Sequence, residues 1–190
     1  MYRGKFILED LCTKKNVLDD CSRSLAENEN NQLKASTLVS CIIHYLEENC
    51  VTDSKTPVVI YYDGYGYQNR NNILANALLN FAIKHNVLVF EKYLEPGHSQ
   101  MECDSVHSMI DRRLENKEIH LPSDYASITD QAMKGTKPYR VKILDHTFFK
   151  DHSSSNHMRY SSIRPGRKAY DPTITDIRYI KYDPVGTIEI

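Results

Sequence analysis

Four side chains near the middle of the sequence could take part in metal or acid–base chemistry: Asp63, Asp104, His107 and Asp111. Asp63 directly follows the apolar run 57–62, which is typical of a buried strand. A carboxylate at the end of such a strand can hold a divalent cation, because Mg²⁺ takes one or two carboxylates together with phosphate oxygens. The alternative for Asp63 is structural, since Asp before Gly often caps a tight turn.

The other three residues fall on one predicted helix. Asp104 and Asp111 are seven positions apart, so they would lie two turns apart, about 10 Å along the helix axis. His107 stands between them, within side-chain reach of both. The structural alternatives are that Asp104 is an early-turn acid favoured by the helix dipole and that Asp111 pairs with a nearby Arg.

Other catalytic patterns are weak or missing. His98, Cys103 and His107 give only three potential zinc ligands, whereas structural zinc sites usually have four. The glycines at 64 and 66 do not form a GxGxxG fingerprint, and no P-loop lysine follows them. No GxSxG elbow occurs, which argues against a hydrolase of that kind.

A strongly basic block lies nearer the C-terminal end. Residues 134–168 carry nine Lys and Arg against two Asp, a net charge of +7, although the whole chain has a net charge of −1. Segment 160–168 combines a tyrosine, three cations and a Pro-Gly pair, which suits contacts with a phosphate backbone. The alternative is a solvated basic loop. The candidate nucleic-acid-binding residues are Arg70, Arg159, Arg164, Arg167 and Lys168.

The elements that must position these residues alternate between strands and helices. Strands are predicted at 57–63 and 87–93, with a helix over 70–85 between them, and this pattern is typical of a βαβ unit. One of Asn69, Asn71 and Asn72 is expected to cap that helix. Further predictions are helices at 33–48, 100–116 and 122–133, short strands at 6–8 and 139–146, a long loop at 150–172 and a hairpin over 176–190.

Composition limits the class of protein. A chain of 190 residues is long enough for one full core and short for two. The five cysteines are an odd number without a CxxC pair, which indicates reduced thiols and a nuclear or cytoplasmic location. No apolar run approaches the roughly 20 residues of a membrane helix.

The order of short motifs resembles a group of transposon-derived proteins of animal genomes, over about residues 36 to 186. The motifs are Tyr62-Asp63-Gly64, Gln68-Asn69-Arg70-Asn71, Gly97-His98-Ser99-Gln100, Asp104-Ser105-Val106-His107 and Ile110-Asp111. The core of that group is similar to the RNase H-like domain of DDE-type transposases and integrases.

The resemblance implies an α/β fold with an RNase H-like mixed sheet flanked by helices, to which the residue pattern adds the C-terminal hairpin. It also implies that acids hold Mg²⁺ or Mn²⁺ for phosphoryl transfer on DNA. Asp63 and Asp104 would be the metal-binding acids, with Asp111 as an alternative, and His98 and His107 would line the site.

The chain departs from the group in two respects. Asp111 stands where a Glu is usual, and the first acid of such a core belongs to an early strand, whereas Asp10, Asp19 and Asp20 follow no convincing strand. We therefore expect a core incomplete at its N-terminus, with weak or lost catalysis. The expected organisation is a weakly patterned segment 1–35, a core 36–135 and a basic loop and hairpin 136–190. The alternative function is a non-catalytic module that binds nucleic acid or protein.

Overall fold

The computed structural model of the chain describes residues 5–6, 31–51, 56–62, 70–95, 102–132, 141, 144, 146–166 and 168–190. For residues 5–6, 31–34, 102–107, 122, 146 and 155 it describes the backbone only. The helices are α2 (Asn31–Asn49), α4 (Asn72–His85), α5 (Glu102–Leu114) and α6 (Pro122–Asp130). The strands are β1 (Lys5–Phe6), β2 (Val58–Tyr62), β3 (Val89–Tyr93), β4 (Tyr179–Tyr182) and β5 (Ile188–Glu189).

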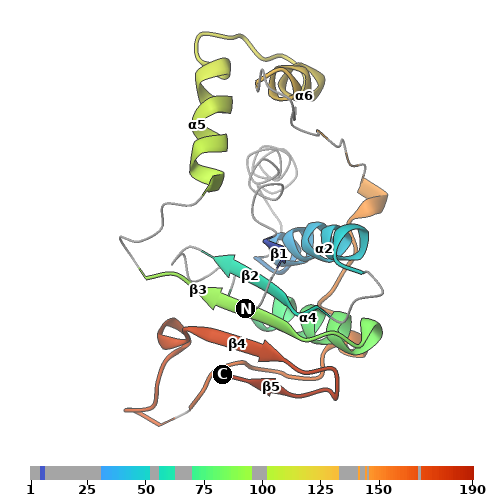
Figure 1. The fold of residues 1–190 in the computed structure, drawn as a ribbon, viewed down its shortest axis with the longest axis vertical. Coiled ribbons are helices and arrows are strands. Elements are labelled where there is room, and N and C mark those ends of the chain that lie inside the picture. The colour runs from blue at the N-terminus through green and yellow to red at the C-terminus, as the bar shows by residue number, and fades with distance from the viewer. Residues whose placement is uncertain are drawn as a thin grey trace.

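The five strands form one mixed sheet in the order β1-β2-β3-β4-β5 (Figure 1). Strands β1, β2 and β3 are parallel, with Tyr62 opposite Tyr93 at the last pair of β2 and β3. β4 is antiparallel to β3, and β5 is antiparallel to β4. The mixed α/β class, the β2–α4–β3 unit and the C-terminal hairpin are thus confirmed.

Helix α4 joins β2 to β3 and has clear start and stop signals. The side chain of Asn71 accepts a hydrogen bond from the backbone N–H of Leu74 at 2.9 Å, so Asn71 is the cap among the three predicted candidates. Asn86 ends the helix in the left-handed region at φ 51°, which Asn tolerates better than most residues. The predicted range 70–85 therefore agrees closely with the observed helix.

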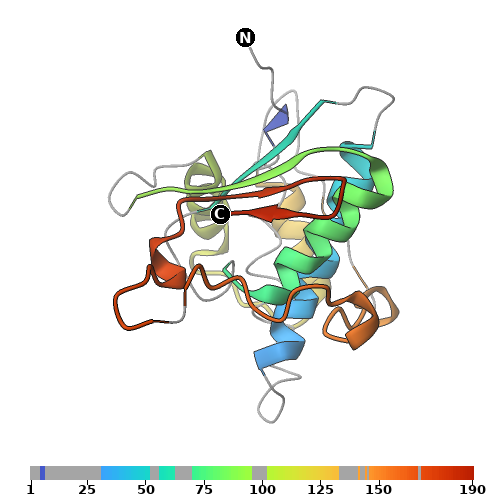
Figure 2. The ribbon, with the colours of Figure 1, turned by 90° about the horizontal axis from the view of Figure 1, so that it is seen from below.

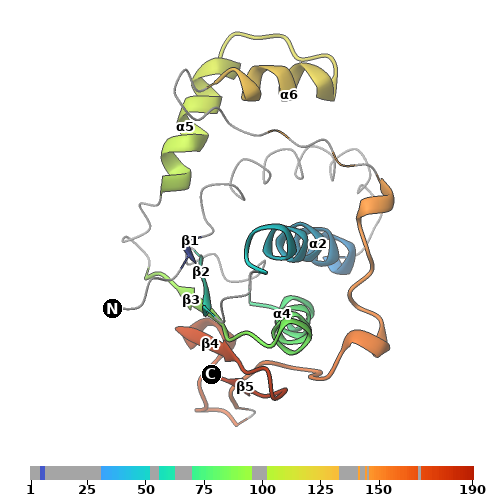
Figure 3. The ribbon, with the colours of Figure 1, turned by 45° about the vertical axis from the view of Figure 1, so that its right-hand side comes forward.

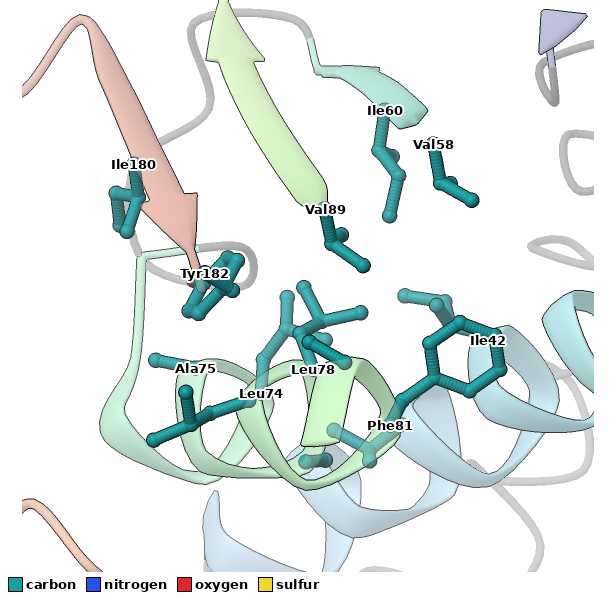
Figure 4. Packing of buried hydrophobic residues seen from close by; sticks show 14 of the residues in the cluster. Ile42, Val58, Ile60, Leu74, Ala75, Leu78, Phe81, Val89, Ile180 and Tyr182 are labelled. Carbon is teal, nitrogen blue, oxygen red and sulfur yellow. The ribbon is translucent and has the colours of Figure 1, made fainter. Parts of the chain in front are cut away.

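The main core lies between the sheet and the two helices α2 and α4 (Figure 4). Leu74 and Leu78 of α4 meet Val89, Ile180 and Tyr182 of the sheet, and all five are 0 % exposed. Burying side chains of this size contributes roughly 1.5–3 kcal/mol each. Because β4 supplies two of the five, residues from the predicted 136–190 extension complete the same core.

Helices α5 and α6 pack against each other through a second, smaller cluster. Its buried members are Ile110 and Ala132, with Leu114 and Tyr125 packed against them. The start of α6 follows its sequence signals: Pro122 is the first helical residue, and Asp124 accepts a hydrogen bond from the N–H of Leu121 at 3.0 Å. Helix α6 ends at Asp130, slightly before the predicted end.

Most other predicted elements are present. Helix α2 covers the predicted range 33–48, and α5 lies within the predicted range 100–116. Residues 150–172, of which all but 167 are described, form a long connection with a 3-10 turn at Ser155–His157 in its first half. The predicted strand 139–146 lies largely outside the described residues, although His146–Phe148 is a 3-10 turn.

Candidate nucleic-acid interface

The connection over residues 150–163, called the strap below, crosses helix α2 and then runs along α4 (Figures 2 and 3). Buried polar side chains of both helices bind its backbone. Because the strap carries part of the basic block, these contacts decide how its cations are presented.

Two serines one turn apart on α2 bind the start of the strap. The N–H of Lys150 donates to Ser40 Oγ at 3.0 Å, and the N–H of His152 donates to Ser36 Oγ at 3.1 Å. Both serines are buried, and Ser40 Oγ also lies 3.2 Å from Nε2 of His152. Burial lowers the pKa of His152, and the nearby His157 and Lys150 lower it further. The neutral ring is therefore favoured beside α2.

Three asparagines spaced four residues apart on α4 bind the rest of the strap. Asn76 is 1 % exposed, and its Oδ1 accepts from the N–H groups of Arg159 (2.7 Å) and Tyr160 (2.9 Å). Its Nδ2 donates to the carbonyl of Tyr160 at 2.8 Å. The outer two amides each add one bond to a strap carbonyl: Asn72 to Ser161 at 3.1 Å and Asn80 to His157 at 2.9 Å. This asparagine row fixes the strap against one stripe of the helix.

An apolar anchor closes the far end of the strap. Ile163 is 4 % exposed within the main core, and Tyr160 packs against the same core. Ile177, just before β4, is also buried in it at 3 % exposure. Residues 164–176 therefore form an excursion between two buried isoleucines.

The described cations of the strap and of this excursion are exposed. Arg159, Arg164 and Lys168 are exposed, and none of them forms an ion pair with another described residue. Arg167 lies outside the described residues. With Lys150, the described part of this stretch carries four exposed cations. Acids are also present, because Asp171 accepts a hydrogen bond from the backbone N–H of Lys168 at 2.8 Å. Over residues 150–176, five Lys and Arg still outnumber three Asp, which favours an anion.

Arg70, the fifth candidate cation, has a different position. It is 6 % exposed, and its guanidinium carbon lies 4.3 Å from the ring centroid of Tyr93. Its Nη2 donates to the carbonyl of Ile177 at 3.3 Å. Through the cation–π contact and this hydrogen bond, Arg70 links β3 to the residue two positions before β4, and it is not presented to a phosphate backbone.

The predicted acidic site is described only in part. Tyr62 ends β2, and the next residue, Asp63, lies outside the described residues, as does His98. Asp104 and His107 are on helix α5, for whose residues 102–107 only the backbone is described. Asp111 is exposed on the same helix. The meeting of Asp63 and Asp104 therefore stays a prediction. Within the described ranges, no group of three or more His, Cys, Asp or Glu side chains could hold a metal ion.

A buried carboxyl group that the sequence reading overlooked lies at the centre of the sheet. Glu91 of β3 is 1 % exposed, and Oε2 of its carboxyl accepts hydrogen bonds from the hydroxyls of Tyr182 and of Tyr93, the latter at 3.3 Å. Its other oxygen, Oε1, has no partner among the described residues. Burial raises the pKa of Glu91 from 4.5 to about 7, although hydrogen bonds from the surrounding tyrosine hydroxyls oppose the rise.

The asparagine row and Glu91 were not predicted, but each leaves a signal in the sequence. Asn72, Asn76 and Asn80 repeat at four-residue spacing on an otherwise apolar helix, which indicates a polar stripe with a partner. Glu91 interrupts the apolar run that begins at Val87, and a lone acid at a core-facing strand position calls for buried hydrogen-bond donors. The identity of those donors comes from strand pairing, which the sequence does not specify.

Comparisons with protein-family models, with curated proteins and with solved structures gave no match. Of the helices in the described parts of the chain, none has the length and apolar character needed to cross a membrane.

Proposed function

We propose that this chain is a DNA-binding domain of the transposase-derived, nuclease-like kind. The observation that carries the proposal is the strap: its backbone is bound by the asparagine row of α4, and it carries the exposed Arg159 with Arg164 and Lys168 just beyond it.

An ordered strap suits phosphate binding for a thermodynamic reason. Immobilising a flexible cationic segment on binding costs conformational entropy, and prior ordering of the backbone reduces that cost. Arg side chains add planar donors that match phosphate oxygens. The expected contacts are therefore with the DNA backbone, which would give affinity and orientation more than sequence selectivity.

The nuclease-like part of the proposal has separate support. β2 lies between two parallel neighbours, and ligands of α/β sheets bind at the carboxyl ends of such strands. Asp63 is the residue after this end of β2, and α5, which carries Asp104, follows β3 in the chain. An RNase H-like core would use these two acids to hold Mg²⁺ or Mn²⁺, which supplies charge stabilisation for phosphoryl transfer.

The DNA-binding proposal is tested with a triple variant that removes three positive charges: Arg159→Gln, Arg164→Gln and Lys168→Gln. A matched control, Arg112→Gln, Arg113→Gln and Lys117→Gln, removes the same number of charges from exposed positions in the last turn of α5 and just after it. Affinity for a short DNA duplex is measured by fluorescence anisotropy between 50 and 200 mM salt, concentrations at which phosphate contacts respond strongly.

The strap variant should bind more weakly than wild type, and its plot of log K against log salt should be flatter by about 2 to 3, since each phosphate contact contributes about 0.9 to the slope. The control should keep most of the wild-type slope. If both triple variants lose the same DNA affinity and salt slope, only net charge matters, and the strap has no special role.

The metal site is tested separately by titrating ¹⁵N-labelled protein with Mg²⁺ and by assaying DNA nicking with Mn²⁺. Shifts around Asp63 and Asp104 that disappear in Asp63→Asn would support the nuclease-like site. If the resonances of both regions do not shift at millimolar metal while DNA binding is intact, the chain belongs to the non-catalytic alternative.

A further inference from the structure

One face of the sheet carries aromatic rings where polar side chains are usual. Side chains alternate between the two faces of a strand, and Val58, Ile60, Val89, Ile180 and Tyr182 point to the core under α2 and α4 (Figure 4). The intervening residues of the three inner strands therefore point to the opposite face. They are Val59 and Tyr61 of β2, Phe90 and Lys92 of β3, and Tyr179 and Lys181 of β4.

The register arranges these residues in two rows across the strands. Lys92 is opposite Tyr61 on one side and opposite Tyr179 on the other. Phe90 is opposite Val59 and Lys181 in the same way. Directly opposite side chains have Cβ atoms about 5 Å apart, so each lysine has an aromatic neighbour on the adjoining strand. Lys92 Nζ lies 5.8 Å from the ring centroid of Tyr61.

Two of the side chains on this face are exposed to solvent. Tyr179 is 46 % exposed and Lys92 is also exposed, while Tyr61 and Phe90 are half-buried. Lys181 is paired with Glu189 at 3.0 Å and Asp183 at 3.6 Å, whereas Lys92 forms no ion pair with the described residues. The side chains on a sheet face that is open to solvent are usually polar. The three rings on this face therefore suggest that it has a binding role.

We infer that this face binds a single-stranded nucleic acid, with bases stacked on Tyr179 and Phe90 and a phosphate held by Lys92. The inference rests on the proposed function and extends it from the strap to a second surface. Unpaired bases expose both faces to aromatic side chains, whereas the bases of a duplex are stacked on each other. The spacing also fits, because successive rows on one face of a sheet are about 7 Å apart along the strand.

Charge favours this occupant over an apolar protein segment. Lys92 lies in one row with the rings of Tyr61 and Tyr179, and such a combination of cation and rings is the usual means of binding single strands without sequence preference. Glu189, which is opposite Lys181 in the register, and Asp183 both pair with Lys181, so Lys92 is the cation of these rows that forms no ion pair with the described residues.

The test compares anisotropy of a labelled oligo-dT with that of a duplex of equal length, using the full chain and three single variants. Tyr179→Ala removes an exposed ring and Tyr179→Phe keeps it. The control, Tyr170→Ala, removes a ring that is fully exposed on the loop beyond the strap. Circular dichroism and size-exclusion chromatography confirm that each variant is folded and report its oligomeric state.

Tyr179→Ala should weaken oligo-dT binding by roughly five- to a hundredfold and leave duplex binding within about twofold, because one stacked base contributes that much. Tyr179→Phe and Tyr170→Ala should bind oligo-dT like wild type.

Duplex binding without oligo-dT binding, or equal oligo-dT affinity of Tyr179→Ala and wild type, would overturn the inference and leave the proposed function standing. A dimer that dissociates in Tyr179→Ala, with no oligo-dT binding, would assign the face to a protein contact instead. Failure to bind either nucleic acid would refute the proposed function itself.

Discussion

Replacing Glu91 with Gln should remove a pH dependence from the stability of the domain. The pKa of this carboxyl is raised by burial from 4.5 to about 7 in the folded state. Below pH 4.5 the group is protonated in both states, so it imposes no cost on folding. As pH rises towards 7, the unfolded chain releases the proton first, and the folded state loses stability relative to it.

The loss follows from the two pKa values. The difference between 4.5 and about 7 corresponds to about 3 kcal/mol, because each tenfold change in proton affinity is worth about 1.4 kcal/mol. Gln has nearly the same shape, and its amide oxygen can still accept from Tyr182, but it does not titrate. The variant should therefore gain up to about 3 kcal/mol relative to wild type between pH 5 and pH 8.

The assay is urea unfolding followed by circular dichroism at pH 5, 6, 7 and 8. The relevant quantity is the difference in unfolding free energy between Glu91→Gln and wild type at each pH, since other titrating groups cancel in it. Glu115→Gln, at an exposed position after α5, is the control and should give a flat difference. If the Glu91→Gln difference is equally flat, the buried carboxyl does not titrate as burial requires, and the reasoning is refuted.

Three further substitutions test the core, the strap and the α4 cap. Asn76→Ala removes three hydrogen bonds to the strap and should cost about 2–3 kcal/mol in urea unfolding; protease should also cut the strap faster than in Asn80→Ala, which loses only one exposed bond. Leu78→Ala empties a fully buried site and should lower the unfolding free energy by about 3–5 kcal/mol. Asn71→Ala removes the α4 cap and should cost about 1 kcal/mol, whereas Asn71→Asp, which keeps an acceptor, should retain most of the stability.

The sequence predicts local elements well because their signals are local. The apolar stripe of α4, its cap at Asn71 and the apolar run of β2 each depend on residues within a few positions of one another. The β2–α4–β3 unit follows from the length of the crossover, which also implies the parallel pairing of its two strands.

Contacts between residues far apart in the chain are harder to predict from the sequence. The sequence predicts a hairpin near the C-terminal end, but not that β4 pairs with β3 and brings Tyr182 to Glu91. Arg70 shows the same limit: its type suggested a phosphate ligand, while its position beneath Tyr93 depends on a contact with residue 177. Residue type indicates what a side chain can do, and tertiary packing decides whether a partner can reach it.

The small cluster around Ile110 and Ala132 has a consequence for motion. Among the side chains of α5 and α6 that the structure describes, few are buried and apolar, and those pack in this second cluster. Regions held by few buried contacts open at lower free energy than the centre of a fold and do so as a unit. Amide protons of α5 should therefore exchange with deuterium well before those of β3, and the helix that carries Asp104 can reorient without melting the sheet.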